Sequence, residues 1–136
     1  IYQWVFWVKA DTALNLKIEF SNIAERLKLP QQNAQEIDKK VQAVQHWLET
    51  HQDWLLIFDN ADHPKLLKPY RPKNSKGKII ITSRAQIFDV IGVSNPVEVQ
   101  EMSPTEAENF LFKRTGREKN YLDAVEVANR LAEELG

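Results

Sequence analysis

The stretch Trp54–Asp62 constrains the fold of this chain more than any other. Five bulky apolar residues stand together and are followed at once by Asp59, Asn60, Ala61 and Asp62. An unbroken apolar run of this length is typical of a strand buried on both faces, and it is too short for a core helix. Open α/β sheets bind ligands beyond the carboxyl ends of such strands, so Asp59 lies where a site is expected. The alternative is that Asp59 only caps the following turn.

Composition and charge limit the classes of function. The 136 residues, 43% apolar and 27% charged, have the size and balance of one globular domain. The net charge of −1 gives no support to a nucleic-acid or membrane partner, and we expect neither. The absence of cysteine removes disulfides and thiolate metal sites and favours a cytoplasmic location. No apolar run approaches the roughly 20 residues that span a bilayer.

The first half of the chain predicts a strand, two helices and a second strand. Residues 2–8 are aromatic and β-branched, which indicates a strand with both faces buried. Asp11 or Thr12 can cap a helix whose apolar stripe ends before Pro30. A second helix is expected from about residue 34 to 52, leading directly into the central apolar run. Two strands joined through helices are expected to run parallel.

A third apolar run, residues 78–84, ends in two hydroxyl side chains and Arg84. If this strand is parallel to the central one, Arg84 and Asp59 emerge at the same edge of the sheet. An arginine beside an acid favours a bidentate phosphate contact, although a lone arginine is often only a surface charge. A phosphate site needs such a pair, because the acid holds Mg²⁺ and the cation meets the terminal phosphate.

The remaining residues predict shorter elements and two helices. Residues 85–91 predict a short helix, and residues 96–100 alternate in the manner of a fourth strand. A capping box at residues 103–106 starts a helix that ends at Gly116. We expect Ala107, Phe110 and Leu111 on the inner face of this helix and a polar turn at residues 117–120 after it. Residues 121–135 predict a last helix with one apolar face.

The sequence lacks the glycine-rich loop that cradles phosphates. No G-x-x-x-x-G-K-[ST] pattern occurs among the 136 residues. Gly77 and Lys78 precede a strand rather than a helix, so we reject them as a phosphate loop. His46, His51 and His63 have no zinc-like spacing, and we find no cluster of metal ligands.

In order and spacing, these pieces resemble the nucleotide-binding domain of the NB-ARC family, within the STAND class of signalling P-loop ATPases. Residues 4–10 resemble its second strand, residues 54–59 its Walker B strand, and residues 78–84 its sensor strand. Residues 97–108 resemble the next strand and helix, and residues 128–136 the helix that leads into the GLPLA motif. The chain is most similar to the bacterial branch, which often carries tetratricopeptide repeats downstream.

The resemblance implies a fold and a division into domains. The fold would be α/β, a three-layer αβα parallel sheet of the P-loop NTPase type. Residues 1–117 would belong to the nucleotide-binding domain, and residues 118–136 would begin the helical subdomain. The Walker A loop and its central strand would precede Ile1, and the GLPLA motif and winged-helix lid would follow Gly136.

The resemblance also implies roles for single residues in an ADP/ATP-dependent signalling switch. Asp59 would be the Walker B acid that orders Mg²⁺ through water, and Arg84 the sensor arginine near the γ-phosphate. Thr82 and Ser83 would place the end of the sensor strand. The intact protein would bind nucleotide and would act on other protein domains or on further copies of itself.

One departure from the family pattern bears on catalysis. Where the family often has a second acid, this chain has Asn60, and an amide cannot act as a general base. Asp62 could replace that base only if the turn brings it round. We therefore expect ATP hydrolysis to be slow or absent.

Two other functions remain open from the sequence. The first is an interaction platform of the NB-ARC type that has lost nucleotide chemistry, which Asn60 favours. The second is a phosphoacceptor domain with Asp59 as the acceptor and Thr82 on the next strand. Such a domain requires a lysine where this chain has Gln100 and Glu101.

Overall fold

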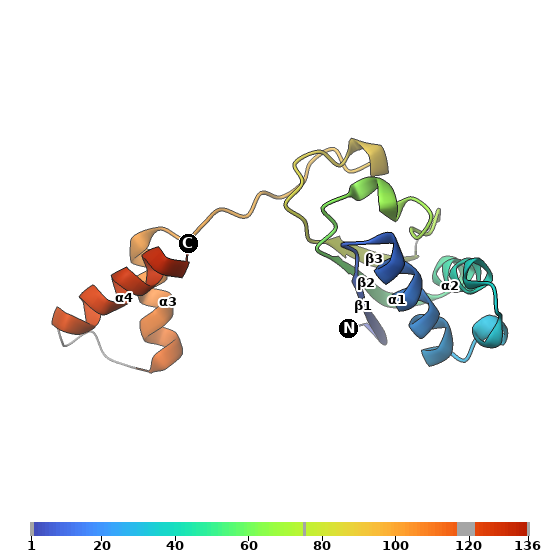
Figure 1. Cartoon of the computed structure of the whole chain (residues 1–136), viewed down its shortest axis with the longest axis horizontal. Coiled ribbons are helices and arrows are strands. Elements are labelled where there is room, and N and C mark those ends of the chain that lie inside the picture. The colour runs from blue at the N-terminus through green and yellow to red at the C-terminus, as the bar shows by residue number, and fades with distance from the viewer. Residues whose placement is uncertain (1, 75, 117–121, 136) are drawn as a thin grey trace. The chain divides into compact units, whose positions relative to one another are not determined.

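The computed structural model describes residues 2–74, 76–116 and 122–135 (Figure 1). The chain divides into two compact units, Ile1–Pro96 and Val97–Gly136. The boundary implied by the family resemblance, between residues 117 and 118, lies further along the chain. Whether residues 1–117 act as one functional domain stays a prediction.

Among the described residues, the first unit contains a parallel sheet of three strands. The strands are β1 (Trp4–Lys9), β2 (Gln52–Asp59) and β3 (Lys76–Ile81). Their order in the sheet is β1-β2-β3, so the central apolar run forms the middle strand. The prediction of a mixed α/β fold with parallel strands is therefore confirmed, and the carboxyl ends of all three strands lie at one edge.

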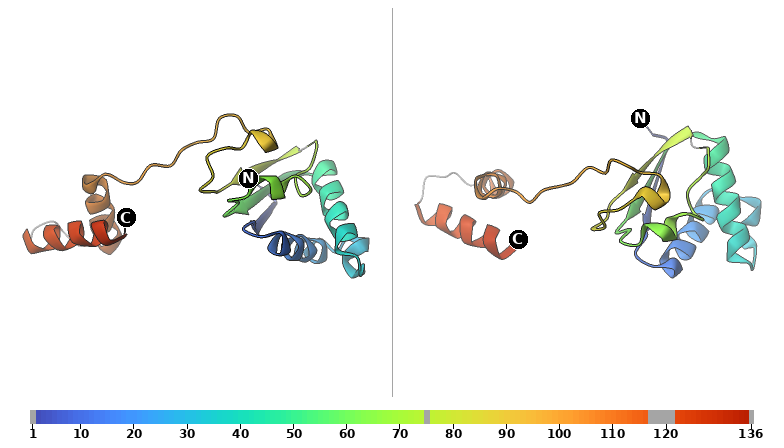
Figure 2. Two further views of the ribbon diagram at one scale, coloured as in Figure 1. Left: turned by 45° about the horizontal axis from the view of Figure 1, so that its top comes forward. Right: turned by 90° about the horizontal axis from the view of Figure 1, so that it is seen from above.

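Two helices, α1 (Ala13–Arg26) and α2 (Ile37–Thr50), lie on one face of this sheet (Figures 1 and 2). Thr12 caps α1 as predicted, because its hydroxyl accepts the N–H of Asn15 at 3.1 Å. Two 3₁₀ helices, η1 (Pro30–Asn33) and η2 (Pro64–Leu67), lie in the connections between strands. The core between helices and sheet holds side chains that are less than 2% exposed: Phe6, Val8, Leu16, Phe20, Val44, Leu48, Trp54, Leu56 and Phe58.

The amino end of β2 is anchored by Trp54, which is fully buried. Its indole N–H donates to the carbonyl oxygens of Leu48 at 3.0 Å and His51 at 3.1 Å. Gly77 in β3 lies against the ring, since a Cβ at this position would lie 2.1 Å from the ring carbon Cδ2. Gly77 therefore serves the close approach of β3 to the indole, which agrees with its rejection as a phosphate loop.

No described helix of this unit covers the opposite face of the sheet (Figure 2). Val5 is 44% exposed, Trp7 60% and Ile80 49%. The prediction that both faces of the strand at residues 2–8 are buried is therefore wrong for this unit. An unbroken apolar run supplies side chains to both faces, but only alternate ones meet the helices. The described residues of this unit form two layers, whereas the family resemblance implies three.

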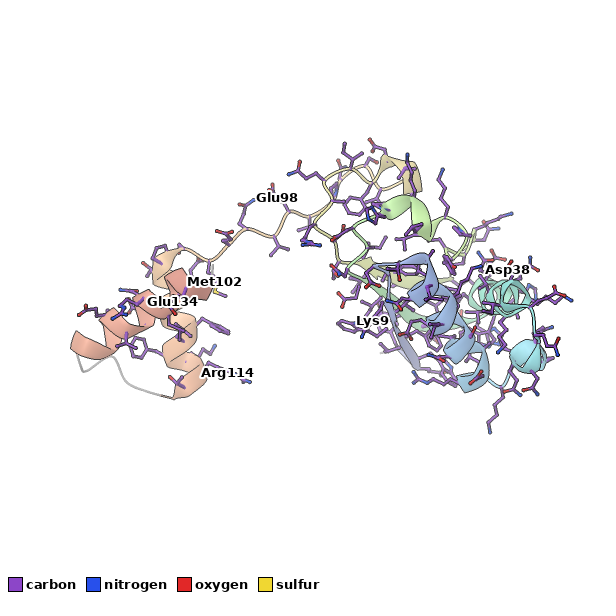
Figure 3. The ribbon with its side chains drawn as sticks, viewed as in Figure 1. Lys9, Asp38, Glu98, Met102, Arg114 and Glu134 are labelled. Carbon is purple, nitrogen blue, oxygen red and sulfur yellow. The ribbon has the colours of Figure 1, made fainter. Side chains whose placement is uncertain are left out.

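The chain after β3 is less regular than its sequence pattern predicts. Residues 85–91 contain only the 3₁₀ helix η3 (Asp89–Ile91), which Gly92 closes in the left-handed conformation with φ 73°. The prediction of a fourth strand at residues 96–100 is wrong, since these residues pair with no described strand. Val97 and Val99 are each 90% exposed, and the side chain of Glu98 projects from this stretch (Figure 3). Alternation of apolar and polar residues is not sufficient, because a strand also needs a neighbour for its N–H and C=O groups.

The second unit is a pair of helices, α3 (Pro104–Thr115) and α4 (Leu122–Leu135). The predicted capping box is confirmed: Ser103 Oγ accepts the Glu106 N–H at 3.4 Å, and Glu106 Oε2 accepts the Ser103 N–H at 2.9 Å. Gly116 follows α3 in the left-handed conformation, with φ 66°, as a helix stop does.

The buried side chains of the second unit differ in one respect from the sequence pattern. That pattern predicts Phe110 on the inner face of α3, but Phe110 is 51% exposed and Phe112 only 8%. Ala128 of α4 is buried, as its place on the apolar stripe predicts. The predicted turn at residues 117–120 lies outside the described residues. None of the helices in the described ranges combines the length and apolar character needed to cross a membrane.

Candidate functional site

The carboxyl ends of β2 and β3 bring two polar segments together. Residues 60–62 follow β2, and residues 82–84 follow β3. The two chains stay hydrogen-bonded beyond the strands: the Thr82 N–H donates to the Phe58 carbonyl at 2.9 Å, and the Ala61 N–H donates to the Thr82 carbonyl at 2.8 Å. The parallel pairing therefore holds both segments side by side at one edge of the sheet.

The carboxylate of Asp59 is held by one donor from each neighbouring strand. Its Oδ1 accepts the hydroxyl of Thr82 at 2.5 Å, and its Oδ2 accepts the indole N–H of Trp7 at 3.2 Å. Thr82 Oγ1 in turn accepts the backbone N–H of Asn60 at 3.0 Å, so the hydroxyl hydrogen is directed to Asp59. Asn60 has φ 59°, a left-handed conformation that asparagine tolerates better than most residues. These contacts fix the carboxylate in one orientation.

Asp62 forms an ion pair with Arg84 at the same edge. Its Oδ1 accepts the backbone N–H of Arg84 at 2.8 Å, and its Oδ2 accepts the Nε–H at 2.8 Å as well as the Nη2–H. Ser83 braces this turn, because its hydroxyl donates to the Ala61 carbonyl at 3.0 Å. The turn after β2 thus brings Asp62 into the site, where it binds the arginine.

The ion pair shifts the titration of both partners. Hydrogen bonds from the Arg84 side chain hold the pKa of Asp62 below its ordinary value of 3.8. The same contact with Asp62 raises the pKa of the Arg84 guanidinium. Asp62 is therefore ionised and already accepting N–H groups at neutral pH, an arrangement that makes it a poor general base.

The donor set around Asp59 suits Mg²⁺. This ion prefers oxygen ligands and, in phosphate sites, takes one or two protein carboxylates while water and phosphate supply the rest. Asp59 offers a carboxylate and Thr82 a hydroxyl oxygen beside it. Among the described residues, no group of three or more His, Asp or Glu side chains could hold a metal. Asp59, with Thr82 beside it, is therefore the residue of this edge that could hold such an ion.

The structure places the predicted site residues Asp59, Thr82, Ser83 and Arg84 at one edge of the sheet. It differs from the simplest expectation at Arg84, whose guanidinium binds Asp62. Whether any of these residues contacts a nucleotide or a metal stays a prediction.

Trp7 is a residue of this edge that the sequence reasoning missed. No local sequence pattern points to it, because only the register of β1 and β2, in which Lys9 pairs with Asp59, makes the two residues meet. Side chains two positions apart along a strand share one face, so Trp7 lies on the same face as Asp59, one step before it. The sequence pattern predicts a strand buried on both faces, so it does not predict the exposure of Trp7.

No model of a known protein family matches this chain, and no curated protein matches it.

Proposed function

We propose that this chain is part of a nucleotide-binding domain that switches between ADP-bound and ATP-bound states, of the kind found in the NB-ARC family. The observation that supports the proposal best is the edge itself, where Asp59 and Arg84 follow two adjacent parallel strands. This is the placement that phosphate sites in open α/β sheets use. Hydrogen bonds join the two segments on which these residues lie.

In this proposal each residue of the edge has one task. Asp59 holds Mg²⁺ through water, with Thr82 keeping its carboxylate in place. Arg84 binds a terminal phosphate oxygen, and Ser83 braces the turn that carries it. When bound, the ion neutralises phosphate charge and orients the phosphates.

The proposal includes a fold of the P-loop NTPase type, with a further parallel strand beside β3. Among the described strands, β3 has β2 as its only neighbour. An edge of this kind offers unpaired backbone groups to an additional strand. That strand would carry the phosphate-binding loop, which the 136 residues do not contain.

Hydrolysis by such a domain is proposed to be slow or absent. Asn60 stands where a second acid is common in the family, and Asp62 is held by Arg84. Neither side chain is placed to take a proton from water. A slow reaction suits a switch, because each nucleotide state then persists long enough to be sensed by a partner.

The second candidate function is a nucleotide-inert interaction platform. The observation that favours it is the Asp62–Arg84 pair, which occupies the guanidinium that a phosphate would need. A phosphate would have to displace the Asp62 carboxylate from Arg84, whereas the function of a platform does not require the ion pair to open.

The test is the binding of Mg·ADP and Mg·ATP, measured by calorimetry on the protein as the cell produces it. We expect Asp59→Ala to abolish the Mg²⁺-dependent part of binding. Asp89→Ala is the matched control, because it removes an exposed aspartate at the start of η3 and should leave binding unchanged. Absence of Mg²⁺-dependent nucleotide binding by the unaltered protein would favour the platform, and binding that Asp59→Ala leaves unchanged would contradict the role of Asp59.

A further inference from the structure

Trp7 is exposed and yet has a protein partner for its indole N–H. Its side chain is 60% exposed, on the face of the sheet that the helices of its unit do not cover. Its indole N–H nevertheless has a protein partner, Asp59 Oδ2 at 3.2 Å. An exposed indole could donate to water, so burial does not explain this contact.

With the Trp7 contact, each carboxylate oxygen of Asp59 accepts one hydrogen bond. Thr82, which follows β3, donates to Oδ1, and Trp7 of β1 donates to Oδ2. The carboxylate at the end of the middle strand is therefore held from both sides, by one neutral donor on each oxygen. A carboxylate oxygen has two lone pairs, so each oxygen keeps one for water or a metal ion.

We infer that Trp7 is a positioning residue, which orients the Asp59 carboxylate for a divalent cation. The inference rests on the proposed role of Asp59 in binding Mg²⁺. Hydrogen bonds to metal-binding carboxylates fix their direction, and removal of such a partner typically weakens metal binding on the order of ten-fold or more. Trp7 acts through Asp59 and does not itself touch the metal.

A purely structural role for Trp7 makes a different prediction. The ring lies on the exposed face of β1 and could simply shield the neighbouring strand. In that case a phenylalanine would serve nearly as well, because it keeps an aromatic ring on this face. Trp7→Phe therefore separates the two roles, since it removes the N–H and keeps most of the apolar surface.

The experiment uses the full chain and Mg²⁺ as the chloride, titrated at constant ionic strength and followed by ¹H–¹⁵N NMR. The indole N–H of Trp7 gives its own resonance, which Trp7→Phe identifies by its loss. We expect the Asp59 amide and this indole resonance to move together and to saturate with Mg²⁺. Neither should respond in Asp59→Asn.

Affinity is then compared between variants through the Asp59 amide. Trp7→Phe should bind Mg²⁺ on the order of ten-fold more weakly. Trp4→Phe is the matched control, because it removes an indole N–H from the same strand on the helix-covered side, where the ring packs against Phe6 and Trp47. It should leave the Mg²⁺ affinity unchanged.

The outcomes distinguish this inference from the proposed function. If the Asp59 amide saturates with Mg²⁺ but Trp7→Phe binds as tightly as the unaltered chain, the positioning role is overturned and the metal site stands. If the Asp59 amide shows no saturable response, the metal site falls, and the positioning role falls with it. Equal weakening by Trp7→Phe and Trp4→Phe would show a loss of stability rather than of positioning, and would also overturn the inference.

Discussion

Two tryptophans at opposite ends of the sheet show how differently one residue type can be used. Trp54, at the amino end of β2, is fully buried, and its N–H donates to two backbone carbonyls. Trp7, near the carboxyl end of β1, is 60% exposed, and its N–H donates to a carboxylate. Packing and backbone contacts hold Trp54 in place, whereas the hydrogen bond of Trp7 joins two side chains at an exposed position.

The same contrast holds for the backbone at the two ends of β2. Asp53 and Asn60 both have left-handed φ angles, 61° and 59°. Asp53 accompanies an irregularity in the pairing of β2 with β3 beside Gln52 and Leu55. Asn60 instead aims its N–H at the Thr82 hydroxyl that binds Asp59. A left-handed residue thus coincides with an irregularity in strand pairing at one end of β2 and lies in the candidate site at the other.

The largest difference between the two ends should appear when both tryptophans are truncated. Trp54→Ala should lower the free energy of unfolding by about 4 kcal/mol, because it removes a fully buried ring. Trp7→Ala should lower it by less than about 1 kcal/mol, because most of that ring already contacts water. Chemical denaturation of both variants measures the difference. Equal losses would show that the two ends contribute equally to stability.

Gly77 offers a smaller perturbation of the amino end. Gly77→Ala places a Cβ against the Trp54 ring and should cost about 2 kcal/mol through overpacking. Gly92→Ala is the control, since open space surrounds Gly92 and only its φ of 73° opposes a side chain. That variant should lose about 1 kcal/mol. If Gly77→Ala unfolds at the same denaturant concentration as the unaltered chain, the close packing of Gly77 against Trp54 does not contribute to stability as proposed.

The carboxyl edge also contains a residue with a purely structural task. Thr12 caps α1 just beyond β1, and Thr12→Ala should lower the free energy of unfolding by about 1 kcal/mol. Ser21→Ala, which removes a hydroxyl that donates to the Lys17 carbonyl within α1, should change it by less than about 0.5 kcal/mol. A loss of metal affinity in Thr12→Ala would instead connect the helix cap to the site.

The Asp62–Arg84 pair should give the smallest effect, and one that depends on pH. The folded-state pKa of Asp62 is lowered, so the pair stabilises the fold above pH 3.8, the ordinary value, and this contribution is lost as the pH falls through the lowered pKa. Arg84→Gln should raise the pKa of Asp62 and remove this part of the pH dependence. Carboxyl ¹³C titration measures the pKa directly, and an Asp62 that titrates at its ordinary value in the unaltered chain would contradict the pairing.

The elements that sequence predicted well are those with a local cause. Thr12 and Ser103 cap helices through contacts within four residues, and the apolar run ending at Asp59 forms a strand. The sequence also predicts Asp59 and Arg84 at the same edge of the sheet. The connection between their strands is long enough for parallel pairing, and parallel pairing brings the two carboxyl ends together. For the candidate site, the sequence therefore predicts which edge of the sheet carries the polar residues. It does not predict which of these residues contact one another.

The features that sequence missed depend on a partner far along the chain. Residues 96–100 have the alternation of a strand, but pairing requires a neighbour that alternation cannot supply. Trp7 reaches Asp59 across 52 positions of sequence, and only the register of β1 and β2 makes the two meet. The partner of Arg84 was likewise undetermined, because the course of a turn decides whether Asp62 or a ligand lies within reach.

The register of the sheet also bears on the order in which its strands assemble. Leu56 pairs with Ile79 on one side and with Phe6 on the other, so the loop that β3 closes is about half as long as the loop that β1 closes. Each doubling of loop length costs roughly 0.6 kcal/mol of closure entropy, which favours early pairing of β2 with β3. We therefore expect Thr82 to bind Asp59 before β1 joins the sheet. The hydrogen bond to Oδ1 would then form first, and the hydrogen bond from Trp7 to Oδ2 would form last.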